Sequence, residues 1–123
     1  MEVIRASEGE TSEGTGAAIF EGQVWARRLA GGDTGRGRDL SFGIVHFAPG
    51  ARAKPHRHSS DQLLYVVSGI GKVGAGSEEH RVGSGDFVLI PAGEDHWHGA
   101  ADTGSPMSHI TVTLSDSETT VLE

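Results

Sequence analysis

The sequence predicts an all-β fold, an antiparallel sandwich or barrel with little helix. Three observations support this class. Short runs of apolar and β-branched residues recur along the chain, glycine- and proline-rich turns separate them, and no long window keeps an apolar repeat of 3.6 residues. Many short strands joined by such turns are typical of sandwiches and barrels.

The 123 residues suit a single domain that spans residues 1–123. Its start is polar: residues 6–16 are rich in Ser, Glu, Gly and Thr, which predicts a flexible arm over residues 1–16. Residues 17–30 hold enough apolar side chains for one or two early strands. The glycine-rich stretch 31–39 predicts a polar loop.

Seven further strands are predicted from residue 40 onward. In chain order they are Leu40–Phe47, Leu63–Val67, Gly71–Ala75, His80–Val82, Phe87–Ile90, His96–Ala100 and Met107–Leu114. Turn residues separate them, and one of these turns is predicted at Ser68 and Gly69, between the second and third strands of the series.

The composition excludes several classes of protein. Lys and Arg total 10 against 17 Asp and Glu, so the net charge is −7, which argues against nucleic acid as a partner. The absence of cysteine removes disulfide scaffolds and thiolate metal sites. No apolar run is long enough to span a bilayer, and the N-terminus lacks the basic and apolar stretches of a signal peptide. We therefore expect a cytoplasmic protein without membrane contact.

Most of the chemical information lies in the histidines, of which there are seven. His56 and His58 form a His-x-His pair, and on a strand such residues face the same side. Gln62 follows three residues later, and His96 begins another predicted strand. Three neutral imidazoles and one amide oxygen can hold a divalent cation with open coordination positions. Taken alone, however, a His-x-His pair is more often a surface feature.

The spacing around these residues resembles the two motifs of the cupin family. The first motif, G-x5-H-x-H-x3,4-E-x6-G, corresponds to residues 50–69, which read GARAKPHRHSSDQLLYVVSG. The second, G-x5-P-x-G-x2-H-x3-N, corresponds to residues 85–100, which read GDFVLIPAGEDHWHGA. Eight of the ten fixed positions match, and 15 residues separate the motifs, as in small bacterial cupins.

The resemblance implies a double-stranded β-helix, the jelly-roll-like barrel of the cupins. It also implies that His56, His58, Gln62 and His96 are the ligands of one divalent metal ion: manganese, iron, nickel, zinc or copper. Two positions depart from the family pattern, since Gln62 replaces the usual glutamate and Ala100 the usual asparagine. A neutral ligand set leaves the ion its full charge, which favours Lewis-acid chemistry over oxidation.

A narrower resemblance covers residues 96–110. The stretch HWHGA followed by M-S-H is similar to small bacterial cupins that include carboxymuconolactone-decarboxylase-associated cupins and manganese-dependent hydroxynitrile lyases. In those lyases the histidine that matches His109 acts as a base. Thr113 stands where they have glutamine, which weakens the case for cyanohydrin cleavage. His109 is equally well explained as a wall or dimer-contact residue, and His98 is a second catalytic candidate that also suits a supporting role beside the ligands.

The function expected is thus that of a metal-dependent lyase or isomerase acting on a small oxygenated molecule. A metal-dependent dioxygenase and a non-catalytic small-molecule-binding barrel are alternatives, and a metal-free barrel with histidine as sole base is a third. By analogy with small cupins, we expect a homodimer that uses residues 1–25, the arm and the first strand region, as an exchanged or added strand.

Overall fold

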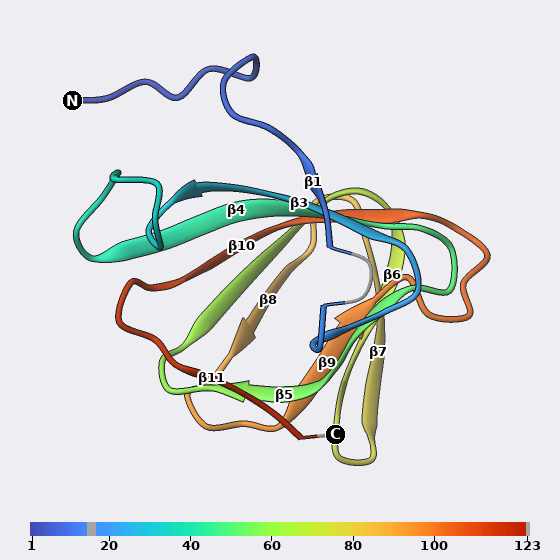
Figure 1. Cartoon of the computed structure of the whole chain (residues 1–123). Helices are drawn as coiled ribbons and strands as arrows, with labels where there is room; N and C mark the ends of the chain where they lie inside the picture. Colours follow the sequence, from blue (N-terminus) through green and yellow to red (C-terminus); the bar gives the residue numbers. More distant parts are fainter. Residues whose placement is uncertain (15–16, 123) are drawn as a thin grey trace.

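The computed structural model describes residues 1–14 and 17–122, and these residues form strands and loops without any helix. Residues 15 and 16 of the predicted flexible arm lie outside the described part. Figure 1 shows the strands curling into two facing layers. The strands are β1 Ser12–Glu13, β2 Phe20–Glu21, β3 Val24–Ala30, β4 Leu40–Phe47, β5 Arg52–His58, β6 Gln62–Ala75, β7 Glu78–Gly83, β8 Phe87–Ile90, β9 His96–Gly99, β10 Met107–Leu114 and β11 Thr119–Val121.

The order of the strands explains the two layers. One layer runs β1-β3-β4-β10 and continues into the first half of β6, which also pairs with β8. The other contains β11, β5 and β9 and the second half of β6, which also pairs with β7. All the pairings are antiparallel, so the predicted all-β antiparallel class is confirmed. The apolar core fills the space between the layers.

The predicted turn at Ser68 and Gly69 is wrong, because the two strands predicted on either side of it form the single strand β6. β6 bends there and passes from one layer to the other. Gly69 has φ of +81°, a conformation that suits glycine, and the pairing with β10 shifts by one residue beside it. Inward-facing residues accordingly change phase, from Leu64 and Val66 before the bend to Val73 after it.

Three strands escaped prediction. β5 carries Pro55 and few apolar residues, and its pairing with β9 shifts between Ala53 and His56. β11 is short and polar, and β1 lies within the arm, where it pairs with β3 of the same chain. The described residues contain no helix long and apolar enough to cross a membrane.

The first layer places its inward residues in rows that lead from the core toward the exterior. Neighbouring strands contribute one residue each to a row, in the order β3, β4, β10. From the buried end outward, the rows are Val24–Phe47–Met107, Ala26–Val45–His109 and Arg28–Gly43–Thr111. The barrel is therefore apolar at one end and becomes polar toward the other.

Candidate functional site

Three histidines from two adjacent strands converge inside the barrel. His56 and His58 lie on the same face of β5, and His96 at the start of β9 is paired with His56. One ring nitrogen of each lies within 4.8 Å of the others, an arrangement that can hold a metal ion. The three residues that the sequence motif singled out are therefore brought together.

The backbone fixes the orientation of two of these rings. Nδ1 of His56 lies 2.5 Å from the carbonyl oxygen of Lys54, and Nδ1 of His96 lies 2.8 Å from that of Glu94. A carbonyl can only accept, so each Nδ1 carries the hydrogen and donates it. In a neutral ring Nε2 then keeps its lone pair and is free to bind a cation.

Gln62 presents its carbonyl oxygen to the same place. Its Oε1 lies 3.0 Å from Nε2 of His96, while its amide nitrogen donates to Oγ1 of Thr111 at 2.9 Å. Two lone-pair atoms that face each other this closely repel unless a cation lies between them. A separation of about 3 Å is that of two ligands at a right angle with bonds of about 2.1 Å. The reversed amide would donate to His96 and would suit the site without an ion.

His58 completes the set. Its Nδ1 lies 2.8 Å from Oγ1 of Thr119, and its Nε2 is buried with no hydrogen-bond partner in the described structure. A buried polar atom without a partner is costly, and a bound ion would relieve that cost. The unpaired nitrogen and the facing oxygen of Gln62 both fit a divalent metal ion bound by this donor set.

Burial keeps these rings neutral. It lowers the pKa of His56 to about 4 and also lowers the pKa of His58 and of His96, with smaller contributions from repulsion between neighbouring imidazoles at His56 and His58. Metal ligation requires deprotonated imidazole, so the rings are in the correct state at neutral pH.

His98 and His109 form a second histidine cluster deeper in the barrel. Nε2 of His109 lies 3.0 Å from Nδ1 of His98, and the other two nitrogens of the pair, His98 Nε2 and His109 Nδ1, are buried without partners. Burial lowers the pKa of both, to about 4 for His109 and well below the usual value for His98. The His98 ring also contacts His56, with centroids 5.3 Å apart, so the pair adjoins the three-histidine cluster.

One cavity of about 370 Å³ is lined by His58 and Gln62 and by both members of the second cluster, whereas His96 lines a separate cavity. Hydroxyl groups form much of the rest of its wall, and none of the described residues that line it is Asp or Glu. The histidine cavity, as we call it, is lined by His58, Gln62, His98, His109, Thr111, Thr113, Ser41, Ser115, Ser117, Thr119, Arg27, Arg28 and a set of apolar residues.

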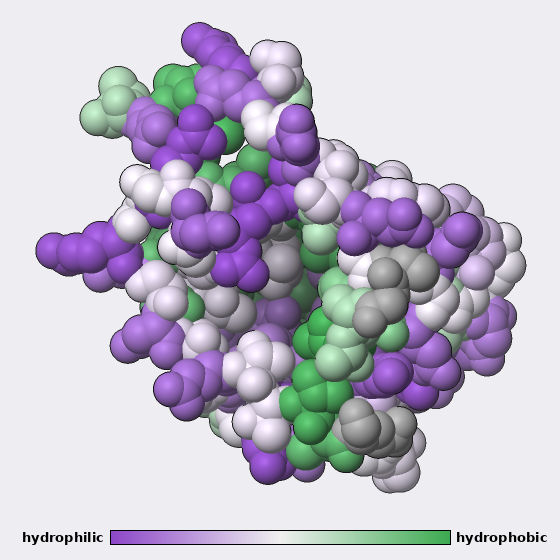
Figure 2. All heavy atoms as spheres, viewed as in Figure 1, coloured by the Kyte–Doolittle hydropathy of each residue, from purple (hydrophilic) through white to green (hydrophobic). Residues whose placement is uncertain are grey.

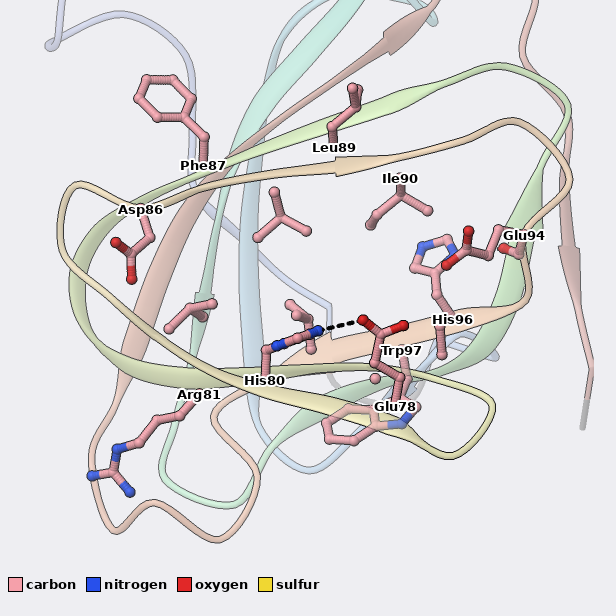
Figure 3. Close-up of a pocket in the computed structure, with 15 residues that line it drawn as sticks. Glu78, His80, Arg81, Asp86, Phe87, Leu89, Ile90, Glu94, His96 and Trp97 are labelled. Atoms are coloured by element: carbon pink, nitrogen blue, oxygen red, sulfur yellow. Dashed lines mark hydrogen bonds and ion pairs between the residues drawn. The ribbon is translucent and has the colours of Figure 1, made fainter.

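A second cavity, of about 460 Å³, opens between β7, β8 and β9 (Figure 3). It has acidic residues, Trp97 and His96 of the three-histidine cluster in its wall, and His80 lies 2.6 Å from Glu78 on the same strand, β7. In Figure 3 Phe87 and Leu89 point away from its centre. We call this the acidic cavity. Glu94 and Asp95 directly precede His96, but their side chains are exposed, and the backbone carbonyl of Glu94 is what contacts His96.

Several residues of the histidine cavity were not found from the sequence. Thr119, which contacts His58, lies on the unpredicted strand β11. The sequence did not identify Arg28 or Ser117 as residues of this cavity, because neither belongs to a motif. Thr111 is different, because the side-chain alternation of the strand Met107–Leu114 puts it on the same face as His109.

Comparison with known proteins gives a family match. The sequence pattern of the family described as Cupin domain matches residues 43–113, which is more than half of the chain. The matched region contains both histidine clusters.

Two curated relatives and one solved structure illustrate the similarity. The chain is 42% identical over 71 residues to an (R)-mandelonitrile lyase of Granulicella tundricola, covering 55% of this chain and 52% of that protein. It is 32% identical over 75 residues to a dimethylsulfoniopropionate lyase of Ruegeria pomeroyi, covering 61% and 49%. The chain thus spans about half the length of these relatives. A cupin-like protein of Thermotoga maritima superposes with a TM-score of 0.79 at 29% identity, over 94% of this chain and 87% of that one.

Proposed function

The chain belongs to the cupin domain family, and on that premise we propose that it is a metal-dependent enzyme of the lyase or isomerase type that acts on a small oxygenated organic molecule. The observation that carries this proposal is a set of neutral nitrogen and oxygen donors that converge beside a cavity, one of which, Nε2 of His58, is buried without a partner. Two of the relatives are lyases by name, which supports the same reaction type.

In this proposal His56, His58, His96 and Gln62 hold one divalent ion. When bound, the ion would supply Lewis-acid polarisation of a substrate oxygen. The four donors contribute no negative charge, so they leave the full charge of the ion available for that purpose. Manganese, iron, nickel, zinc and copper all suit imidazole ligands.

The His98–His109 pair is proposed to move the proton. Two neutral imidazoles carry two hydrogens, and one of these lies in the bond between Nδ1 of His98 and Nε2 of His109. A proton taken up at His98 Nε2 can be shared along this bond and returned through the same atom, because His109 Nδ1 is buried without a partner that could receive it. Burial opposes a lasting charge on either ring and therefore favours that return. Lyases and isomerases require such proton removal and return.

The test is the metal content of protein purified without chelator or nickel column. The wild type is expected to contain about one divalent ion per chain, and the double variant His56→Ala, His58→Ala almost none. His80→Ala is the matched control, because it removes a histidine from the acidic cavity and should leave the metal content unchanged. Wild type and double variant that are equally empty, with no thermal stabilisation by added metal, would contradict the proposal. A redox-active ion would direct the assays toward the alternative, dioxygenase chemistry.

A homodimer is part of the proposal. The outer face of the first layer carries exposed apolar side chains, with Phe87 at 68% and Leu89 at 70% exposure, and these pair across the strands with Tyr65 and Leu63. This row contains no charged residue, so two copies of an acidic chain could meet there without repulsion. A dimer in sedimentation equilibrium that the variant Leu89→Lys converts to a monomer would support this, and a wild-type monomer would contradict it.

The N-terminal arm offers less support for strand exchange. In the described residues β1 pairs with β3 of its own chain, and Nη1 of Arg27 donates to the carbonyl oxygens of Ala6 and Glu8. Figure 2 shows that the face on which the arm lies is mostly hydrophilic, with one apolar strip near the C-terminal end.

A further inference from the structure

The mouth of the histidine cavity carries positive charge, although the chain as a whole carries −7. Two arginines, Arg27 and Arg28, line the cavity, and none of its described lining residues is acidic. The chain has 17 acidic residues and only 10 basic ones, so the charge of the cavity wall is opposite in sign to that of the whole chain. Positive charge at a cavity mouth attracts anions.

Arg28 is the arginine whose position suits a ligand in the cavity. It pairs with Gly43, which pairs with Thr111, so all three lie in one inward-facing row. Gly43 has no side chain, and an added Cβ would collide with the backbone of Arg27 and Arg28, so β3 lies close against β4 at this point. Thr111 in turn binds the amide of Gln62. Arg28 therefore lies in the same row as Thr111, which contacts the proposed ligand set, and one row nearer the exterior than His109.

The guanidinium of Arg28 has no partner among the described residues. The neighbouring arginines differ: Arg27 donates to the carbonyl oxygens of Ala6 and Glu8, and Arg36 pairs with Glu2 and Glu8. Arg28 is exposed at the mouth and lies against Gly32 in the turn that follows β3. Its five donors remain available to an incoming anion.

A second unpartnered group lies in the same cavity. Oγ of Ser117 is buried and has no hydrogen-bond partner. Thr113, Ser41 and Ser115 add further hydroxyl groups to the same wall. Hydroxyl groups bind both the oxygens and the hydroxyls of a polar ligand, so the wall suits an oxygen-rich molecule.

We propose that the histidine cavity selects small hydroxy acids: Arg28 pairs with a carboxylate remote from the reacting carbon, and the hydroxyl or carbonyl oxygen lies at the histidine end. This inference rests on the proposed function for the role of the histidine end, whereas the carboxylate pairing depends on Arg28 alone. The guanidinium can bind a carboxylate through two parallel hydrogen bonds. This arrangement fixes the orientation of the ligand and selects a ligand with a negative charge.

The test compares two probes that differ only in the distal charge, 2-hydroxyglutarate and its 5-amide. Calorimetry with the manganese-supplemented protein is expected to show the acid binding about tenfold more tightly than the amide, with the difference falling as salt is added. Arg28→Gln should weaken the acid about tenfold and leave the amide unchanged. Arg81→Gln, which removes the same charge from the wall of the acidic cavity, is the matched control and should change neither.

The outcomes separate this inference from the metal proposal. If the preference for the acid and its dependence on Arg28 persist in excess chelator, the inference stands even if no metal binds. Equal binding of acid and amide, acid binding that Arg28→Gln leaves intact, or no binding of either probe at millimolar concentration would each overturn it. The thermal stability of Arg28→Gln should match the wild type, because the side chain is exposed and unpaired.

Discussion

Two cavities of the barrel are similar in size, and they differ in how their polar groups are satisfied. In the histidine cavity, imidazole nitrogens of His58, His98 and His109 are buried with no hydrogen-bond partner among the described residues. In the acidic cavity, His80 and Glu78 pair with each other at 2.6 Å and are 61% and 67% exposed. Histidine side chains line both cavities, so residue type alone does not identify a metal site. Burial without a partner distinguishes the one that can bind an ion.

The first way to test this comparison is acidification, which should destabilise the protein through the histidine cavity. The unfolded pKa of histidine is about 6.5, and the folded values of His56 and His109 are about 4. The unfolded chain therefore binds more protons below pH 6.5, so stability is full above that pH and is lost progressively down to about pH 4. By pH 5 each of these residues should have removed about 2 kcal/mol of stability.

Urea unfolding at pH 7.5, 6 and 5 in the presence of chelator measures this effect. The same experiment on His80→Ala should give the same loss, because His80 is exposed in the acidic cavity. A free energy of unfolding that is equal at pH 7.5 and pH 5 would show that the buried rings are not held neutral by the fold.

The next largest loss of stability is expected from a change at the bend in β6. This strand contributes residues to the walls of both cavities. Gly69→Ala should reduce stability by more than about 3 kcal/mol, because an added Cβ would collide with the carbonyl oxygen of Pro106 at a positive φ. Gly85→Ala is the control: it has a similar φ of +91° with no atom within 4 Å of the new Cβ, so it should cost only about 1 kcal/mol. Thermal or urea unfolding of the two variants would compare them. Equal costs would mean that the close approach at the bend does not matter.

A smaller effect should follow from adding charge to the ligand set. Gln62→Glu is expected to tighten manganese binding about tenfold, because a carboxylate attracts the ion more strongly than an amide, and the Thr111 hydroxyl, which accepts from the Gln62 amide, can turn to donate to the carboxylate. Competition with a chelator of known affinity measures the change. Glu78→Gln in the acidic cavity should leave the affinity unchanged. If Gln62→Glu has no effect, Gln62 does not contact the ion.

The smallest effect is expected at the exposed pair of the acidic cavity. His80→Ala should change the free energy of unfolding by no more than about 0.5 kcal/mol, since solvent-exposed ion pairs contribute little. Urea unfolding at pH 7.5 is sufficient. A loss above about 1 kcal/mol would mean that this pair is structurally important, and that exposure does not distinguish it from the buried histidines of the histidine cavity.

Much of this fold could be predicted from local sequence. The alternation in Met107–Leu114 puts His109, Thr111 and Thr113 on one face, and in the structure that face lines the histidine cavity. The resemblance to the cupin motifs implied that His56, His58 and His96 share one site, and the structure brings the three rings together.

Features that depend on long-range pairing could not be predicted. Ser68 and Gly69 have the composition of a turn, and only the pairing of β6 with β10 on one side and with β7 and β9 on the other shows that the strand continues. The orientation of Arg28 depends on its register with Gly43, next to a shift in the pairing of β3 with β4. Thr119 reaches His58 from a strand without an apolar pattern.

The most direct test of the central claim is an anomalous-difference map from crystals of the protein incubated with manganese. We expect one peak in the barrel, from a manganese ion bonded to His56, His58, His96 and the oxygen of Gln62. We expect no peak in the acidic cavity beside Glu78 and His80. A map with no peak among the three histidines, a peak in the acidic cavity instead, or a Gln62 side chain that points its amide nitrogen at His96 would contradict it.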